Sequence, residues 1–134
     1  MKVVLDTNVL ISGIFWSGTP YHILQAYTAG KFELVVSTDI LNEYMEVIRR
    51  IDTEGDLAQR WSLYLTEKAI LVKDVAVVKI SRDPDDDIFI NAAVVGKASY
   101  LVSGDDDLLS LAGSSPVKMI NPSAFLKIVR KDTR

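Results

Sequence analysis

Acidic residues are the side chains of this sequence best suited to chemistry, and they occur in four groups along the chain. Asp6 directly follows the apolar run 3–5, Glu43 lies downstream, and two dense groups occupy 83–87 and 105–107. Carboxylates that are packed together repel one another and need a counter-charge. Their oxygens suit hard cations such as Mg²⁺, and also Mn²⁺. If the four groups meet in the fold, they predict a divalent-metal site.

Such a site would suit the hydrolysis of phosphate esters. Mg²⁺ usually keeps several waters and needs only one or two carboxylates besides a substrate phosphate, so a few acidic side chains are enough. One metal ion can turn a bound water into an attacking hydroxide, and a second can stabilise the leaving oxygen. This chemistry needs no cysteine or histidine nucleophile. The chain has no cysteine, and its single histidine, His22, is far from the acidic groups in sequence.

The elements around these acids predict that they do meet. Short apolar runs at 3–5, 33–36 and 100–103 are typical of strands buried in a parallel sheet. A further strand is expected at 117–120, and one or two at 69–80. Helix-compatible segments lie at 8–15, 57–69 and 107–112, and others begin at Pro20, after Ser37 or Thr38, at Pro84 and at Pro122.

Residues at the ends of these helices give capping signals. Thr19 is the expected N-cap of the helix that Pro20 opens, and Asn121 has the same place before Pro122. Gly30 and Gly96 are placed to end two helices. These signals set the boundaries of the elements that position the acids.

Alternating strands and helices predict an α/β fold, a three-layer α/β/α sandwich around a mostly parallel central sheet. We expect one domain over 1–130 and a basic tail at 131–134. In such folds the functional crevice lies at the carboxyl ends of the strands. Asp6 and Asp105 each follow a strand, and Glu43 and Asp87 each lie near the start of a helix. All four positions belong to the same edge of the sheet.

The charge of the chain is unevenly distributed. The net charge is −3, yet half of the eighteen acids belong to the four groups. Without those nine, the chain has fifteen basic and nine acidic residues, a balance of +6. A basic surface around a metal site would suit a polyanion such as RNA, although ordinary mixed surface charge explains the numbers equally well. The nine acids are Asp6, Glu43, Asp83, Asp85, Asp86, Asp87, Asp105, Asp106 and Asp107.

The composition also restricts the compartment. The absence of cysteine excludes disulfides and zinc–thiolate sites. No apolar run approaches the length of a membrane span, and a strand that begins at residue 2 leaves no room for a secretion signal. We therefore expect a cytoplasmic protein.

The four acidic groups together resemble a known family. Asp6-Thr7-Asn8-Val9-Leu10 closely resembles the opening motif of PIN-domain ribonucleases. Glu43 matches the second acid of the family, Asp87 before an alanine-rich helix looks like the third, and Asp105 after Leu101-Val102-Ser103 looks like the fourth. The order and spacing fit along nearly the whole chain.

The resemblance also implies a biological role. Arg82-Asp83-Pro84-Asp85-Asp86 is similar to a subgroup known as the toxins of toxin–antitoxin pairs, the VapC-like proteins. It implies a Mg²⁺- or Mn²⁺-dependent endoribonuclease that cleaves single-stranded or structured RNA. Such proteins are usually homodimers and are held inactive by a small antitoxin protein.

The resemblance implies a role for each acid. The catalytic residues would be Asp6, Glu43, Asp87 and Asp105, and the metal ligands Asp6, Glu43, Asp86, Asp87, Asp105 and Asp107. The third acid stays open, because alignment back from Ser103 favours Asp87, whereas relatives with asparagine after the second Asp favour Asp86. Asp107 is either a ligand or the cap of the helix after Asp105.

Several other polar residues have two possible roles, one in the site and one that is purely structural. Thr7, Asn8 and Ser103 would hydrogen-bond the metal-binding acids, or only satisfy backbone groups at helix starts. Arg49, Arg82 and Lys97 are candidate contacts to RNA phosphates, but solvation at the surface explains them equally well.

Three other functions compete with the nuclease. The spacing of Asp83, Asp85 and Asp87 resembles a calcium-binding loop, but Ile88 and Val94 replace the required glycine and glutamate. A phosphatase with an aspartyl nucleophile would need an acid where Asn8 stands. A non-catalytic RNA- or protein-binding module of the same fold would be expected to have lost acids that this chain keeps.

Overall fold

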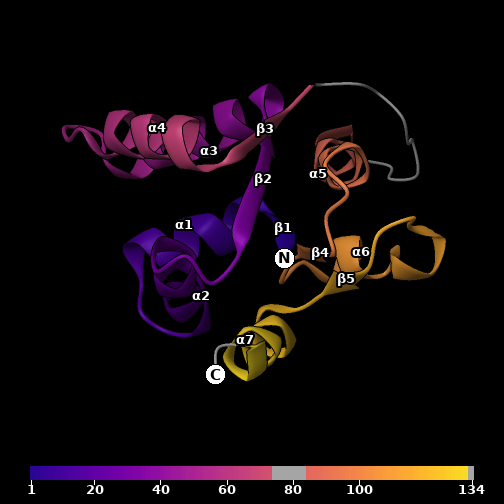
Figure 1. Ribbon diagram of the computed structural model, residues 1–134. Coiled ribbons are helices and arrows are strands. Elements are labelled where there is room, and N and C mark those ends of the chain that lie inside the picture. The colour runs from indigo at the N-terminus through magenta and orange to yellow at the C-terminus, as the bar shows by residue number, and fades with distance from the viewer. Residues whose placement is uncertain (74–83, 133–134) are drawn as a thin grey trace.

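A parallel sheet lies at the centre of the computed structural model, which describes residues 1–73 and 84–132 (Figure 1). The order of its five strands is β3-β2-β1-β4-β5, and all neighbouring pairs are parallel. The sheet confirms the predicted parallel architecture. The strands are β1 Lys2–Leu5, β2 Glu33–Ser37, β3 Ile70–Val72, β4 Tyr100–Val102 and β5 Met119–Ile120.

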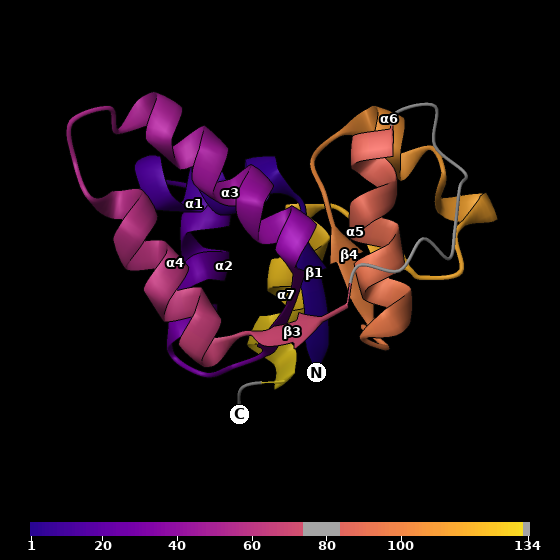
Figure 2. The same cartoon turned by 90° about the horizontal axis from the view of Figure 1, so that it is seen from above.

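Helices lie on both sides of the sheet, as the predicted three-layer sandwich requires. Figure 1 shows α5 on one side of β2, and α1 with α2 on the other. Seen from above, α3 and α4 run beside each other on the side of α1 and α2, and α3 also reaches α5 (Figure 2). The helices are α1 Thr7–Phe15, α2 Thr19–Thr28, α3 Thr38–Ile51, α4 Leu57–Lys68, α5 Pro84–Val95, α6 Asp106–Leu109 and α7 Pro122–Asp132, with a short 3₁₀ turn at Ala112–Ser114.

The strands are buried because they are apolar on both faces. Val3, Val4 and Leu5 of β1 have no solvent exposure, and β2 and β4 supply similar residues on either side. Burying apolar surface is the main favourable term in folding, and a central parallel strand can bury both of its faces. β1 therefore lies at the centre of the molecule, and the residue that follows it is held firmly.

Close packing against glycine fixes two of the helices. A Cβ on Gly13 of α1 would lie 2.7 Å from the Pro20 carbonyl oxygen, so α2 begins directly against α1. A Cβ on Gly96 would lie 2.6 Å from a methyl group of Val35. Gly96 does follow the end of α5, but the residue with left-handed backbone there is Lys97, at φ 53°.

Three of the predicted capping residues, Ser37, Asn121 and Gly30, are confirmed, and Thr19 is wrong. Ser37 caps α3 through the Ile40 amide at 3.2 Å, Asn121 accepts from the Ala124 amide at 2.8 Å, and Gly30 has a φ of 80° after α2. Thr19 is not an N-cap. It is the first residue of α2, and Gly18 precedes it at φ 117°, a conformation that glycine adopts without the strain that a Cβ brings.

The C-terminal part departs from the expected boundaries. The segment 107–112 was expected to be one helix, but it contains only the end of α6 and the start of the 3₁₀ turn. The strand expected at 117–120 is limited to Met119–Ile120, because the Ser115 hydroxyl binds both the amide and the carbonyl of Val117. Helix α7 continues through Asp132, two residues into the expected tail.

Two further findings complete the fold. Of the strands expected at 69–80, β3 lies in the described part, and 74–80 lie outside it. None of the helices within 1–73 and 84–132 has both the length and the apolarity needed to cross a membrane.

Candidate functional site

Two neighbouring strands bring the first and last acidic groups together. β1 and β4 pair in parallel with Leu5 opposite Val102, and the Asp6 amide donates to the Val102 carbonyl at 3.0 Å. Asp6 directly follows β1, and Asp105 lies three residues after β4. Both therefore lie at the carboxyl edge of the sheet, where α/β folds bind their ligands.

Asp6 is a buried carboxylate with a defined orientation. Only 5% of its surface is exposed. Its Oδ1 accepts a hydrogen bond from the Val9 amide at 2.9 Å, which makes it the N-cap of α1. Its Oδ2 accepts from the hydroxyl of Ser103, which is fully buried. The same hydroxyl accepts from the Asp105 amide at 3.0 Å, so Ser103 links the two acids.

The surroundings of Asp6 are unfavourable for its negative charge. Burial raises the pKa of the Asp6 carboxyl above its usual 3.8, and the hydrogen bonds from Ser103 and Val9 only partly oppose that shift. The charges of Asp105 and Asp86 raise the pKa further. Acids from three separate elements therefore act on one another here, and a bound cation would relieve their repulsion.

Glu43 joins the same site through a neighbour of Asp6. The Thr7 hydroxyl donates a hydrogen bond to the Glu43 carboxylate, so α1 and α3 are tied together beside Asp6. Thr7 is buried, and Glu43 is half-buried. The site thus includes an acid from the helix that follows β2.

Tyr44 supports the site through a hydrogen bond to the end of β1, a role that the sequence does not indicate. Its ring is fully buried, and its hydroxyl donates to the Leu5 carbonyl, directly before Asp6. Burial raises the pKa of Tyr44 well above 10, and the charges of Asp6 and Glu43 add to the effect. The hydroxyl therefore stays a neutral donor. Tyr44 has the helical spacing of the buried apolar residues Ile40 and Ile48, and no sequence signal separates a packing role from this supporting role.

Both candidates for the third acid lie in the first turn of α5. Asp86 is half-buried, and its charge contributes to the raised pKa of Asp6. Asp87 is more deeply buried, with 9% of its surface exposed. Asp86 and Asp87 therefore both stay candidates for the third acid, Asp86 through its charge beside Asp6 and Asp87 through its burial. Arg82 and Asp83 lie outside the described residues, as does the side chain of Asp85.

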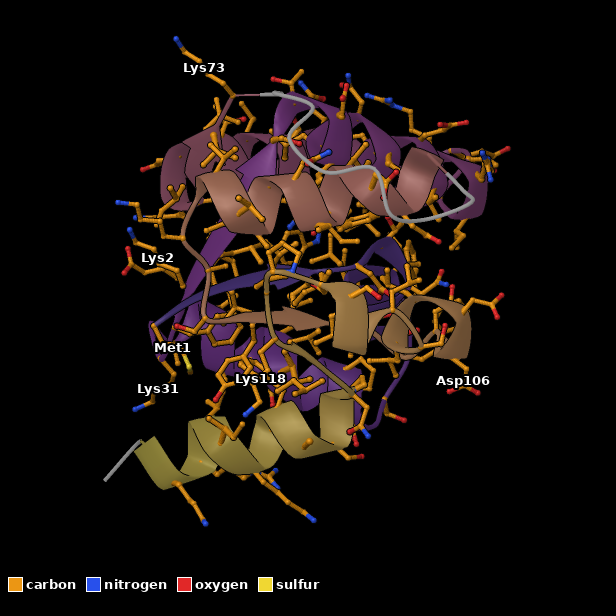
Figure 3. All side chains as sticks on the ribbon, turned by 90° about the vertical axis from the view of Figure 1, so that its right-hand side faces the viewer. Met1, Lys2, Lys31, Lys73, Asp106 and Lys118 are labelled. Atoms are coloured by element: carbon orange, nitrogen blue, oxygen red, sulfur yellow. The ribbon has the colours of Figure 1, made fainter. Side chains whose placement is uncertain are left out.

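The acids after β4 have different roles. Asp105 accepts from the Asp107 amide at 2.9 Å and is the N-cap of α6, so the expectation that Asp107 caps this helix is wrong. Asp105 rather than Asp107 is the N-cap because the backbone of Asp105 is extended, at φ −86° and ψ 116°, as an N-cap requires. Asp106 extends outward at the periphery of the molecule (Figure 3).

A cleft of about 520 Å³ lies beside these acids, between α1 and the loop after β4. Asn8 is exposed on its wall, so its side chain points to the cleft and makes no hydrogen bond with the acids that the structure describes. The residues that line the cleft are Asn8, Val9, Ser12, Pro20, Gly104, Asp105, Asp106, Asp107 and Pro122.

Two of the three basic residues singled out in the sequence, Arg49 and Lys97, lie away from this edge. Arg49 is exposed in the last turn of α3, well beyond Glu43. Lys97 is exposed between α5 and β4, and therefore lies at the amino end of the strand whose carboxyl end leads to Asp105.

The donor set fits a hard divalent cation. Among the side chains that the structure describes, no group of three or more acidic or histidine residues is arranged to hold a metal ion by itself. Mg²⁺ does not require one, because it commonly binds one or two carboxylates and completes its shell with water and phosphate. The ligands on offer are carboxylate oxygens, which suit Mg²⁺ or Mn²⁺ better than the nitrogen and sulfur ligands that zinc prefers.

Comparison with known proteins concerns the fold and the sequence of the whole chain. The PIN domain matches residues 2–107. An uncharacterized protein from Methanocaldococcus jannaschii is 29% identical over 128 residues, which cover 90% of this chain and 81% of that protein. The crystal structure of VapBC2 from Rickettsia felis, bound to a DNA fragment from their promoter, matches with a TM-score of 0.62 at 16% identity. That match covers 90% of this chain and 98% of the other, and at such low identity it shows the fold.

Proposed function

The chain belongs to the PIN-domain family, whose members are generally nucleases, and from this premise we propose that it is a Mg²⁺- or Mn²⁺-dependent endoribonuclease. The observation that carries the proposal is the buried Asp6 carboxylate, which is oriented by two hydrogen bonds and lies among the charges of Asp105 and Asp86. Retaining this arrangement is unfavourable unless a cation binds, so its presence supports a metal-dependent reaction.

We assign the metal ligands from the same contacts. Asp6, Asp105 and Asp86 would hold the ion, with Glu43 beside them, and Asp86 is placed ahead of Asp87 because its charge acts on Asp6. Asp107 remains a candidate ligand on the cleft wall. When bound, the ion would lower the pKa of a coordinated water and neutralise charge on the phosphate.

The other residues of the site hold these ligands in place. Ser103 and the Val9 amide fix the two oxygens of Asp6, so the unused lone pairs of the carboxylate have a fixed direction. Thr7 fixes Glu43, and Tyr44 fixes the strand end at Leu5. Such supporting hydrogen bonds determine how precisely ligands are held.

Cleavage of a labelled single-stranded RNA in Mn²⁺ tests the activity. We expect EDTA, Asp6→Asn and Asp105→Asn each to abolish cleavage while circular dichroism shows an intact fold. Glu46→Gln is the matched control, because Glu46 is an exposed acid of α3 that pairs with Arg50 away from the site. Full activity of both aspartate variants would rule out the proposed centre.

We further propose that the protein acts in the cytoplasm as the toxin of a toxin–antitoxin pair, as a homodimer bound by a small antitoxin. The similarity to VapBC2 and the resemblance of 82–86 to VapC-like proteins support this role. Expression of the wild-type chain alone should arrest bacterial growth, and expression of Asp6→Asn should not. Equal growth of the two cultures, at equal protein levels and with active enzyme in vitro, would argue for RNA processing instead.

A further inference from the structure

We infer that the cleft beside Asp105 binds the base of the nucleotide next to the cleaved phosphate, and that Asn8 and Ser12 determine which base it accepts. The inference rests on the proposed ribonuclease function. It assigns a selective role to residues of α1 that contribute nothing to holding the acids in the structure.

The two polar side chains form one wall of the cleft. Asn8 and Ser12 are four residues apart on α1, so they lie on the same helix face, one turn from each other. Both line the cleft, Asn8 exposed and Ser12 half-buried. Neither side chain hydrogen-bonds to another residue in the part of the chain that the structure describes. Their donors and acceptors are therefore available to a ligand.

The remaining walls suit a flat, mostly apolar group. Pro20 and Pro122, at the starts of α2 and α7, supply rings without amide donors, and Val9 adds apolar surface. Gly104 contributes no side chain. The volume of about 520 Å³ falls within the ~300–1,000 Å³ typical of small-molecule pockets. The lining combines this apolar surface with a similar share of polar surface, so a ligand that fits it must have both apolar faces and polar edges.

The charge of the cleft favours a base over a phosphate. Asp105, Asp106 and Asp107 lie along one side, and none of the described residues that line the cleft is basic. A phosphate there would be repelled, whereas the base is neutral and can donate hydrogen bonds. Single-stranded RNA is commonly read through the exposed edges of its bases, and an asparagine amide both donates and accepts.

The cleft adjoins the proposed centre, and its α1–α2 wall is closely packed. Asn8 lies two residues after Asp6, so a base on its amide would lie next to a phosphate at the metal. The contact between Gly13 and Pro20 leaves no room for α1 and α2 to approach further. A preformed wall reduces the ordering that binding requires, which favours selective recognition.

The test uses four short RNAs that differ only in the nucleotide on one side of a single cleavage site. We expect wild-type rates to differ at least about tenfold between the best and worst base, because a well-placed bidentate hydrogen-bonding pair discriminates between bases by roughly this factor or more. Asn8→Ala with Ser12→Ala should reduce that spread to about twofold and leave the Mn²⁺ affinity, measured by calorimetry, unchanged. Gln25→Ala, an exposed helical amide outside the cleft, should keep the full spread.

Binding of the same RNAs to the Asp6→Asn variant separates failure of the subsite from failure of the proposed function. If the wild type cleaves nothing, base-dependent binding that the two alanines remove still supports the subsite. Equal binding of the four RNAs, or a spread that the alanines leave intact, overturns it. A uniform loss of cleavage with weaker Mn²⁺ binding in the double variant also overturns it, because Asn8 would then be a positioning residue for the acids.

Discussion

Asp6 and Asn8 are separated by one residue, yet they belong to regions with opposite properties. The Asp6 carboxylate is buried, hydrogen-bonded through both oxygens and surrounded by like charges. The Asn8 amide is exposed on a cleft wall and makes no hydrogen bond among the described residues. The difference separates two tasks. The rigid centre suits the reaction, and the accessible wall suits the choice of substrate.

The largest expected effect on activity concerns which residue, Asp86 or Asp87, is the third acid of the proposed metal centre. We expect Asp86→Asn to abolish Mn²⁺-dependent RNA cleavage, because it removes the acid whose charge acts on Asp6. Asp87→Asn should retain much more activity. Cleavage assays on both variants, normalised to folded protein, decide between them. The opposite ranking would place Asp87 in the centre, as alignment from Ser103 favours.

The next largest effect is on Mn²⁺ affinity, and it distinguishes a serine of the metal centre from a serine of the cleft. Ser103→Ala should weaken Mn²⁺ binding by about 10–100-fold, since groups that orient metal ligands have effects of this size. Ser12→Ala should leave the Mn²⁺ affinity unchanged. Calorimetric titration measures both. Equal affinities in the two variants would mean that the Ser103 hydrogen bond does not orient Asp6.

A stability effect follows from the raised pKa of Asp6. In metal-free protein, the folded state binds more protons than the unfolded state between pH 3.8 and the raised pKa of Asp6. The contribution of the Asp6 carboxyl to the free energy of unfolding therefore falls as the pH rises through that window. Asp6→Asn should therefore be more stable than wild type at pH 7 in EDTA, by about a few degrees in Tm, and less sensitive to pH in the acid range.

The control is Glu67→Gln, which alters an exposed acid. Added Mn²⁺ should raise the Tm of the wild type and not that of Asp6→Asn, by mass action. A lower Tm for Asp6→Asn in EDTA would show that hydrogen bonding to the carboxylate outweighs the unfavourable burial of its charge.

The smallest effect concerns the support beneath the centre. Tyr44→Phe removes the donor to the Leu5 carbonyl and should lower the free energy of unfolding by about 1 kcal/mol. Tyr21→Phe, at an exposed position of α2, should change it much less. Urea denaturation of the two variants gives the comparison. No difference between them would mean that the Leu5 carbonyl is satisfied without Tyr44.

The sequence could predict the sheet and its acidic edge because both depend on simple patterns. Three apolar runs without alternation indicate buried parallel strands, and residues directly after such strands must share an edge. This reasoning predicts that Asp6 and Asp105 lie at the same edge of the sheet. It needed no knowledge of distances, since the topology alone imposes the arrangement.

Other features could not be predicted because they depend on exact geometry. A helix turns by about 100° per residue, so Asp86 and Asp87 point in different directions, and only the start of α5 decides which faces Asp6. Thr19 carries a capping side chain, but Gly18 occupies the N-cap position and Thr19 is already the first residue of α2. The hydroxyl of Tyr44 becomes relevant only because α3 packs its ring beneath β1.

The hydrogen bond between Ser103 and Asp6 joins residues 97 positions apart in the chain. During synthesis, a ribosome releases Asp6 first and Ser103 only after three-quarters of the sequence has been made. Until then β1 lacks β4 as a neighbour, and Asp6 lacks both the hydroxyl that orients it and the acid across from it. Every truncated chain that ends before β4 is therefore without the proposed centre, and the proposed activity has to wait until β4 has been synthesised.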